Sequence, residues 1–153
     1  MNFKFRAATQ NDVEFVYKLH RATMHDYVVQ TWGQWDDAWQ YAYFTEQFDP
    51  STCEIIVSDQ NDIGAISVLR RETDIFLKYV QLFPEYQGRG IGTQLILSLS
   101  EEARTKMLPL TLQVLKVNPA RRLYQRLGFS VTGETKTHYL MTKCRKPGSL
   151  VDD

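Results

Sequence analysis

The segment Pro84–Ile96, with the sequence PEYQGRGIGTQLI, places three closely spaced glycines and an arginine just before a predicted helix. Glycines at 88, 90 and 92 allow positive φ angles and a close approach of backbone to a ligand. Backbone N–H groups at a helix N-terminus attract phosphate, and Arg89 adds a fixed positive charge. We therefore expect this turn to bind a phosphate-containing ligand rather than to serve only as a tight connection.

Two well-known glycine-rich phosphate loops are excluded by the sequence of this turn. A P-loop needs the pattern GxxxxGK[ST], and the chain contains no Gly-Lys pair. A dinucleotide-binding turn needs GxGxxG, but a pattern starting at Gly88 ends on Thr93. The acidic residue expected about 20 positions later is also absent, because Gln113–Lys116 carries none.

Other reactive side chains give no comparable pattern. Cys53 and Cys144 predict two reduced thiols, because two cysteines do not form a disulfide framework and neither has a partner at metal-ligand spacing. We expect no metal site. The N-terminus lacks the apolar region of a secretory signal, and no apolar run reaches the ~20 residues of a membrane helix. The sequence therefore predicts a cytoplasmic protein.

The elements that must position the glycine-rich turn follow from apolar periodicity. A chain of 153 residues corresponds to one domain. Hairpin-connected strands come first and a strand-helix-strand unit second, which indicates a mixed sheet with helices on its faces. The predicted strands are 2–7, 53–58, 63–71, 75–83, 110–117, 129–132 and 137–143; the predicted helices are 13–24, 36–48, 93–107 and 118–127; and 28–33 is a predicted loop.

Charge is balanced overall but unevenly distributed. Eighteen basic residues match 18 acidic ones, so nothing indicates a nucleic-acid or membrane partner. From Ala22 to Leu69 the chain has acids and no lysine or arginine, whereas from Ala103 to Gly133 it has bases and no acid. This division suits a cation bound by the first half and a polyanion bound by the second.

The run Gln87–Gly92 fits the pattern Q/R-x-x-G-x-G/A, and about 30 residues later Asn118–Phe129 reads NPARRLYQRLGF. On these two motifs the chain resembles the GNAT superfamily of acyl-CoA-dependent N-acetyltransferases over nearly its whole length. The resemblance implies an α+β fold: a mixed, mostly antiparallel sheet with a parallel strand pair at the centre and helices on both faces. It also implies one N-acetyltransferase domain at residues 1–145, a polar tail at 146–153, and a possible homodimer.

The same resemblance implies acetyl-CoA as co-substrate. The glycine-rich turn would hold the pyrophosphate, the preceding strand end would pair its backbone with pantetheine, and a bulge there would aim an N–H at the acetyl carbonyl. Asn118 would contact the pantetheine arm, and Arg121 or Arg122 the adenosine phosphates. The implied coenzyme-binding residues are Val80, Gln81, Leu82, Gln87, Gly88, Arg89, Gly90, Ile91, Gly92, Thr93, Asn118 and Arg121.

Tyr124 is the implied catalytic residue, placed beside the coenzyme sulfur. A thiolate leaves when an amine attacks a thioester, and it needs a proton or a hydrogen bond. A phenol with a pKa of about 10 remains protonated where a thiol with a pKa of about 8.5 begins to ionise. Tyr124 is therefore interpreted as a hydrogen-bond donor and general acid. The alternative is a core tyrosine on the apolar stripe of its helix.

The base that takes the proton of the amine is left open by the sequence. Some family members have a glutamate on the strand after the loop helix, but the aligned position is Gln113, and an amide cannot accept that proton. Water could carry the proton instead. The side chains considered are His138, which we favour, and Tyr139, Glu134, His25 and Asp26.

The acceptor is expected over the first two helices, where aromatic and acidic residues occur together. Tyr27, Trp32, Trp35 and Trp39 lie near Asp26, Asp36 and Asp37 in the sequence, a combination that suits a cation. Trp32, in the predicted loop, is expected to form a wall of the site. The predicted substrate-binding residues are Tyr27, Trp32, Trp35 and His138; the alternative is that Trp35 and Trp39 only pack the second helix on the sheet.

Three functions follow for testing. The first is an N-acetyltransferase that moves acetyl from acetyl-CoA to a primary amine, on a small molecule or a peptide, by direct attack in a ternary complex. The second is a non-catalytic acyl-CoA-binding sensor or regulatory module, favoured by Gln113. The third, nucleic-acid binding by the basic segment, is disfavoured by the zero net charge.

Overall fold

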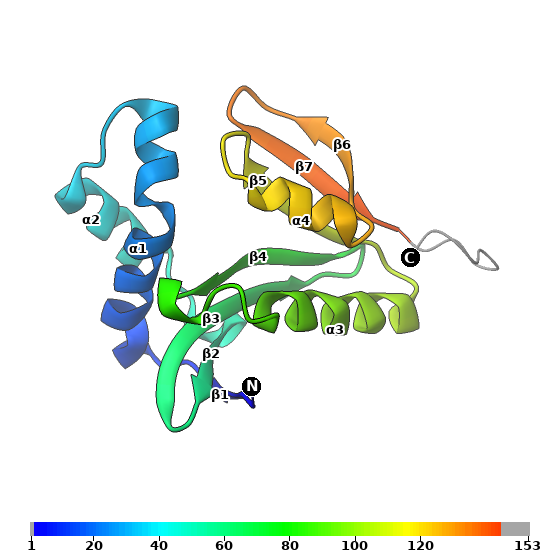
Figure 1. The fold of residues 1–153 in the computed structure, drawn as a ribbon, viewed down its shortest axis with the longest axis horizontal. Coiled ribbons are helices and arrows are strands. Elements are labelled where there is room, and N and C mark those ends of the chain that lie inside the picture. Colours follow the sequence, from blue (N-terminus) through cyan, green and yellow to red (C-terminus); the bar gives the residue numbers. More distant parts are fainter. Residues whose placement is uncertain (1, 145–153) are drawn as a thin grey trace. The chain divides into compact units, whose positions relative to one another are not determined.

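Apolar periodicity along the chain produces seven strands and four α-helices among residues 2–144, which the computed structural model describes (Figure 1). The strands pair in the order β1-β2-β3-β4-β5-β7-β6. Only β4 and β5 are recorded as parallel in this part of the chain. The predicted fold class is confirmed: a mixed, mostly antiparallel sheet with the parallel pair at its centre and helices on both faces. The strands are β1 (Lys4–Ala7), β2 (Cys53–Ser58), β3 (Asn61–Arg70), β4 (Ile75–Leu82), β5 (Leu110–Leu115), β6 (Ser130–Glu134) and β7 (His138–Lys143), and the helices are α1 (Val13–Trp32), α2 (Asp37–Gln47), α3 (Ile91–Lys106) and α4 (Ala120–Arg126).

The chain divides into two compact units, and β3 and β4 each contribute residues to both. The first unit comprises residues 1–67 and 79–92, and the second comprises 68–78 and 93–153. The predicted polar tail at 146–153 lies outside the described residues. None of the helices within residues 2–144 is long and apolar enough to cross a membrane.

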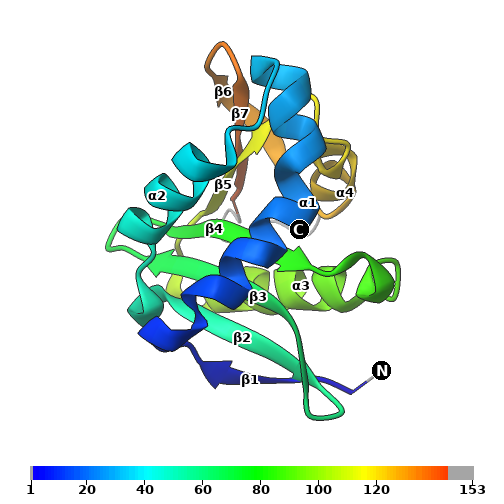
Figure 2. The same cartoon turned by 90° about the vertical axis from the view of Figure 1, so that its left-hand side faces the viewer.

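The core of the first unit lies between the helices α1 and α2 and the strands beside them. Val16 and Leu19 of α1 pack with Ile55 of β2 and Ala65 of β3, and Phe44 of α2 packs against this cluster. In Figure 2, α1 crosses in front of β2 and β3. Burial of these apolar side chains therefore fixes α1 and α2 over this part of the sheet.

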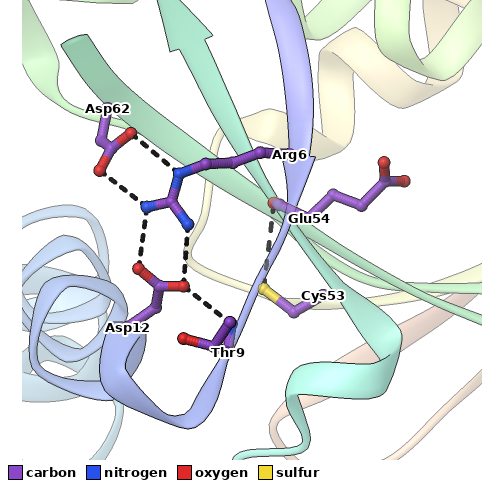
Figure 3. A network of polar contacts seen from close by, with 6 residues as sticks. All are labelled: Arg6, Thr9, Asp12, Cys53, Glu54 and Asp62. Carbon is purple, nitrogen blue, oxygen red and sulfur yellow. Dashed lines mark hydrogen bonds and ion pairs between the residues drawn. The ribbon is translucent and has the colours of Figure 1, made fainter. Parts of the chain in front are cut away.

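An arginine on the edge strand joins three segments of the first unit (Figure 3). The guanidinium of Arg6 donates to both carboxylate oxygens of Asp12, at 2.8 and 3.0 Å, and to Asp62 at 2.9 Å. The Thr9 backbone N–H donates to Asp12 at 2.8 Å. These hydrogen bonds lower the pKa of Asp12, with the Arg6 contact as the largest cause. The bidentate pair ties β1 to the start of α1 and to the β2–β3 hairpin.

Gly64 marks the closest approach of β3 to β4. A Cβ built on Gly64 would stand 2.4 Å from the backbone oxygen of Gln81 and 2.7 Å from a side-chain carbon of Leu82. The Phe83 N–H donates to the Ile63 carbonyl at 3.1 Å beside this contact. Only glycine fits here without moving the end of β4.

In the second unit, β5 connects the parallel and antiparallel parts of the sheet. Its register with β4 covers three pairs, from Ile75 with Leu110 to Leu77 with Leu112, and all six of its residues pair with β7. Asp74, just before β4, accepts from Arg71 at 2.6 Å and from the Thr111 hydroxyl at 2.7 Å. These contacts hold the turn before β4 against β5.

The structure corrects two predicted boundaries, those of helices α1 and α3. Residues 28–33 are not a loop, because α1 continues to Trp32 and ends at Gly33, whose φ is 90°. Val28 is buried, and its packing continues the helix through the predicted loop. Helix α3 begins at Ile91, so Gly92 lies in its first turn rather than in the loop.

Replacing Gly64 with alanine should destabilise the protein by about 1–3 kcal/mol, because the new methyl overlaps the Gln81 carbonyl. Urea unfolding followed by circular dichroism measures this loss. Gly92→Ala is the matched control, since its Cβ would meet nothing within 4 Å and the position is helical. A Gly64→Ala protein that unfolds at the wild-type midpoint would contradict the close-approach account.

Candidate functional site

The turn between β4 and α3 has two glycines in conformations that other residues rarely adopt. After a short 3-10 helix at Pro84–Tyr86, Gly88 and Gly90 have φ angles of 76° and 83°. A Cβ at either position would meet nothing within 4 Å. The glycines are therefore required by the backbone conformation and leave open space above the turn.

The turn presents backbone N–H groups that lack protein partners. Among the described residues, the N–H groups of Gly88 and Gly90 have no protein acceptor, and both residues are exposed. The first amides of α3, beginning at Ile91, have no acceptor within the helix. A series of free N–H groups thus leads into the positive end of the helix dipole, which is the arrangement that binds an anion.

Side chains hold this turn in place while its arginine remains exposed. The Gln87 amide donates to the Leu82 carbonyl at 2.9 Å, which fastens the turn to the end of β4. The Ile91 side chain is only 2% exposed and anchors the start of α3. The Arg89 guanidinium lies 5.4 Å from the centre of the Tyr86 ring and is exposed. Gln87 and Ile91 therefore shape the turn, and Arg89 supplies its charge.

In the second unit, the segment after β5 carries the implied contacts of Asn118 and Arg121. The Asn118 side-chain oxygen accepts from the Ala120 N–H at 2.9 Å, but α4 begins at Ala120 with Pro119 as its N-cap, which corrects the predicted start at residue 118. The Arg121 guanidinium and the Lys116 ammonium lie 5.1 and 5.3 Å from the centre of the Tyr139 ring. Two cations thus share one aromatic ring, which fixes a positive charge at the start of α4.

Tyr124 of α4 has a half-buried ring, which contacts Phe129 edge-on with ring centres 5.8 Å apart. Burial raises the pKa of Tyr124, so its phenol stays protonated. Its hydroxyl has no hydrogen-bond partner among the described residues, yet it is not among their fully enclosed polar atoms. The hydroxyl therefore reaches solvent and is free to donate.

The base candidates suggested by the sequence lie in ordinary surroundings. Nδ1 of His138 lies 2.8 Å from the Thr137 hydroxyl, and burial lowers the pKa of His138. Nδ1 of His25 lies 2.9 Å from the carboxylate of Asp26 on the surface. Gln113 is exposed on β5. Residues 2–144 contain no cluster of three or more side chains able to hold a metal ion.

The predicted aromatic and acidic acceptor region is partly assembled around Asp37. This carboxylate accepts from the Tyr17 hydroxyl at 2.7 Å and from the Trp35 indole N–H at 3.1 Å, and Arg21 lies 3.3 Å away. The hydrogen bond from Tyr17, then that from Trp35, lowers the pKa of Asp37. Burial, then the contact with Asp37, raises the pKa of Tyr17 to about 12. Trp35 is thus fixed between α1 and α2.

The remaining predicted aromatics occupy different positions. Trp32 is 55% exposed in the last turn of α1 and not in a loop, which corrects the prediction. Trp39 does not pack α2 on the sheet, since it is 58% exposed and stacks on Tyr43 with ring centres 5.2 Å apart. Tyr27 is half-buried on α1.

His20 is the functional candidate that the sequence did not reveal. Its Nδ1 lies 3.2 Å from the side-chain nitrogen of Gln81, and its ring stacks on Phe44 and approaches Trp35. Burial lowers the pKa of His20 to about 4. In the sequence it occupies one position of the apolar stripe of α1, and only the polar residue opposite it on β4 would have distinguished it.

The chain matches the family model described as the acetyltransferase (GNAT) domain over residues 49–131. The PaiA N-acetyltransferase of Thermoplasma acidophilum, solved in complex with coenzyme A, has a TM-score of 0.74 at 18% identity and covers 95% of this chain and 100% of its own. An acetyltransferase of Thermus thermophilus has a TM-score of 0.70 at 15% identity, covering 95% and 98%. An N-acetyltransferase of Staphylococcus aureus has a TM-score of 0.69 at 15% identity, and the match covers 91% of this chain and 99% of that protein. No curated protein matches the chain.

The buried neutral state of His20 predicts a pH-dependent stability. Between the ordinary pKa of 6.5 and about 4, the unfolded chain binds a proton at this residue that the folded chain does not. The free energy of unfolding should therefore fall as pH falls through this range, by about 3 kcal/mol from His20 alone, and level off above it.

Urea unfolding at pH 4 to 7 measures this loss. His20→Gln should flatten the slope, and because all carboxylates are common to both proteins, the difference isolates His20. Equal slopes in the two proteins would show that His20 is not held neutral.

Proposed function

The chain belongs to the GNAT acetyltransferase family, and from this premise we propose that it transfers an acetyl group from acetyl-CoA to a primary amine, on a small molecule or a peptide, by direct attack in a ternary complex. The observation that supports it best is the turn before α3, with its unpaired N–H groups and two glycines at positive φ. A diphosphate needs many donors within a short span, and few other ligands fit such a turn.

The backbone and the side chains of the turn have different proposed roles in binding the coenzyme. The N–H groups from Gly88 to Thr93 hold the pyrophosphate, and Arg89 neutralises its charge. The open space at Gly88 and Gly90 suits this role, because a side chain there would meet the ligand. The side chain of Gln87 is bonded to Leu82 and supports the turn.

The end of β4 is proposed to bind the pantetheine arm. The register of β4 with β5 ends at Leu77, and the strand continues to Leu82. The backbone of Val80, Gln81 and Leu82 would pair with the amides of pantetheine as an added strand. A backbone N–H of this segment would then polarise the acetyl carbonyl.

Asn118 and Arg121 are proposed to complete the contacts with the coenzyme. The oxygen of Asn118 accepts from the Ala120 N–H, which leaves its amide NH₂ to donate to the pantetheine arm. Arg121, held over Tyr139, would meet the adenosine phosphates. Arg121 also lies in the basic segment 103–133, which carries no acid.

Tyr124 is the proposed general acid. The raised pKa keeps its phenol protonated, and its hydroxyl has no competing partner among the described residues. As the carbon–sulfur bond breaks, the hydroxyl donates its proton to the departing sulfur. The acceptor amine is proposed to bind over α1 and α2 near Trp35 and Asp37, where an aromatic face and a carboxylate suit a cation, with Tyr27 and Trp32 at the margin.

Gly90→Asp should weaken binding of coenzyme A on the order of 100-fold, because a carboxylate would replace open space and repel the diphosphate. Isothermal titration calorimetry measures the affinity. Gly33→Asp is the matched control, since Gly33 also has a positive φ and open space but ends α1. Near-normal affinity in Gly90→Asp would contradict the assignment of the turn.

Tyr124→Phe should lower kcat on the order of 100-fold while leaving the affinity for coenzyme A unchanged, because only proton donation is lost. Release of free thiol from acetyl-CoA, screened against polyamines, aminoglycosides, amino acids and N-terminal peptides, measures it. Tyr43→Phe, on the surface of α2, should match the wild type. Coenzyme binding without thiol release for any amine would favour the sensor function instead.

A further inference from the structure

One buried amide in the first unit lacks a hydrogen-bond partner. Gln81 is 8% exposed, and its Oε1 is the one fully buried side-chain nitrogen or oxygen without a partner among residues 2–144. The other amide atom faces Nδ1 of His20 at 3.2 Å. Exchanging the nitrogen and oxygen of the amide only changes which atom is unpaired. An unpaired buried polar atom is costly, so its retention points to a function.

The imidazole of His20 is enclosed on its faces and open at one nitrogen. Phe44 stacks on the ring with centres 5.4 Å apart, and Trp35 lies 6.0 Å away. Nδ1 faces Gln81, whereas Nε2 has no hydrogen bond to the described residues and is not one of their enclosed unpaired atoms. Nε2 therefore reaches solvent. A ring with one nitrogen held by an amide and the other open has the geometry of a general base.

The orientation of the Gln81 amide decides which proton state His20 adopts. If the amide N–H donates to Nδ1, the ring carries its proton on Nε2 and cannot be protonated without setting two donors against each other. If Nδ1–H donates to Oε1, Nε2 has a free lone pair, and this hydrogen bond survives protonation of the ring. The second arrangement pairs Oε1 with the ring and leaves the amide NH₂ as the unpaired group, and it alone leaves Nε2 able to accept a proton.

We propose that His20 is the general base of the acetyl transfer, taking the proton of the acceptor amine on Nε2, and that Gln81 is the positioning residue that fixes its tautomer. This inference rests on the proposed function. It assigns two roles to Gln81: the backbone lies along pantetheine, and the side chain holds the base. The amine would consequently react on the α1 side of β4, where Trp35 and Asp37 also lie.

A weak base is sufficient for this step, because the proton that it removes is strongly acidic. The neutral amine uses its lone pair to form the nitrogen–carbon bond, and its nitrogen becomes positively charged and strongly acidic. Nε2 of His20 then takes one N–H proton, the carbon–sulfur bond breaks, and the sulfur receives the Tyr124 proton. His20 afterwards releases its proton to solvent through the open Nε2, and Tyr124 recovers one. Because burial keeps His20 neutral, it is ready to accept at neutral pH.

Burial is the cause of the lowered pKa of His20. Charged and titratable groups on the elements packed around His20 and Gln81 are not its dominant cause. Arg21 and Asp37 neutralise each other at 3.3 Å. The groups facing this region are Tyr17, Arg21 and His25 of α1, Asp37 of α2, and Tyr79 of β4. A charge placed at Gln81 would act on His20 more directly than any of these.

The tautomer is measured first, because it does not depend on activity. Nitrogen-15 chemical shifts of the His20 ring at pH 7, with and without coenzyme A, report which nitrogen carries the proton. We expect a protonated Nδ1 and an unprotonated Nε2. A proton on Nε2 in both states would overturn the proposal, whether or not the protein turns over any amine.

The pH profile tests the coupling of the two residues. In Gln81→Glu a carboxylate would face Nδ1 and stabilise the imidazolium, so the acidic limb of kcat/KM should move up by about one pH unit or more. Gln47→Glu, the same change on the exposed end of α2, should leave the limb in place. His20→Gln should lower kcat on the order of 100-fold with coenzyme affinity unchanged.

The outcomes separate this inference from the proposed function. A limb that does not move in Gln81→Glu, or His20→Gln with wild-type kcat, would overturn the role of His20 while acetyl transfer stands. Coenzyme binding without thiol release in the wild type would overturn the proposed function, and the tautomer measurement would still decide the proton state of His20.

Discussion

Unpaired backbone N–H groups at the start of α3 are the constraint on which the rest of the structure depends. Gly88 and Gly90 are exposed, and their N–H groups have no protein acceptor among the described residues, so they are open to a ligand. The positive φ angles of the two glycines shape the turn that leads from β4 into α3. The Gln87 bond to Leu82 and the buried Ile91 maintain this arrangement, which a compact anion would complete.

A second unpaired group lies at the end of β4, where the turn begins. Gly64 brings β3 close to the Gln81 carbonyl, while the Gln81 side chain meets His20 of α1. Gln81 therefore combines three features. It lies in the part of β4 beyond the register with β5, its carbonyl is in close contact with Gly64, and its side-chain amide has one unpaired atom. Polar pairs with an unsatisfied member are destabilising unless something binds, so this is where chemistry is expected.

Much of this could be read from the sequence because local rules decided it. The spacing of Gly88 and Gly90 follows from the backbone conformation of the turn, which two positive φ angles require. Tertiary packing decided what local rules could not. Val28 extends α1 because it is buried, and His20 looked like one more member of an apolar stripe until β4 placed Gln81 opposite it. Pairings between residues 61 positions apart leave no local signal.

Backbone amide shifts on addition of ligand test the central claim most directly, because they report each N–H of the turn separately. Coenzyme A and its 3′-dephospho form should both shift the amides of Gly88 to Thr93 strongly, since both carry the diphosphate. Pantetheine, which lacks it, should leave these amides near their free positions. Equal shifts with pantetheine, or unshifted amides at saturating coenzyme A, would contradict the assignment of this turn as the diphosphate site.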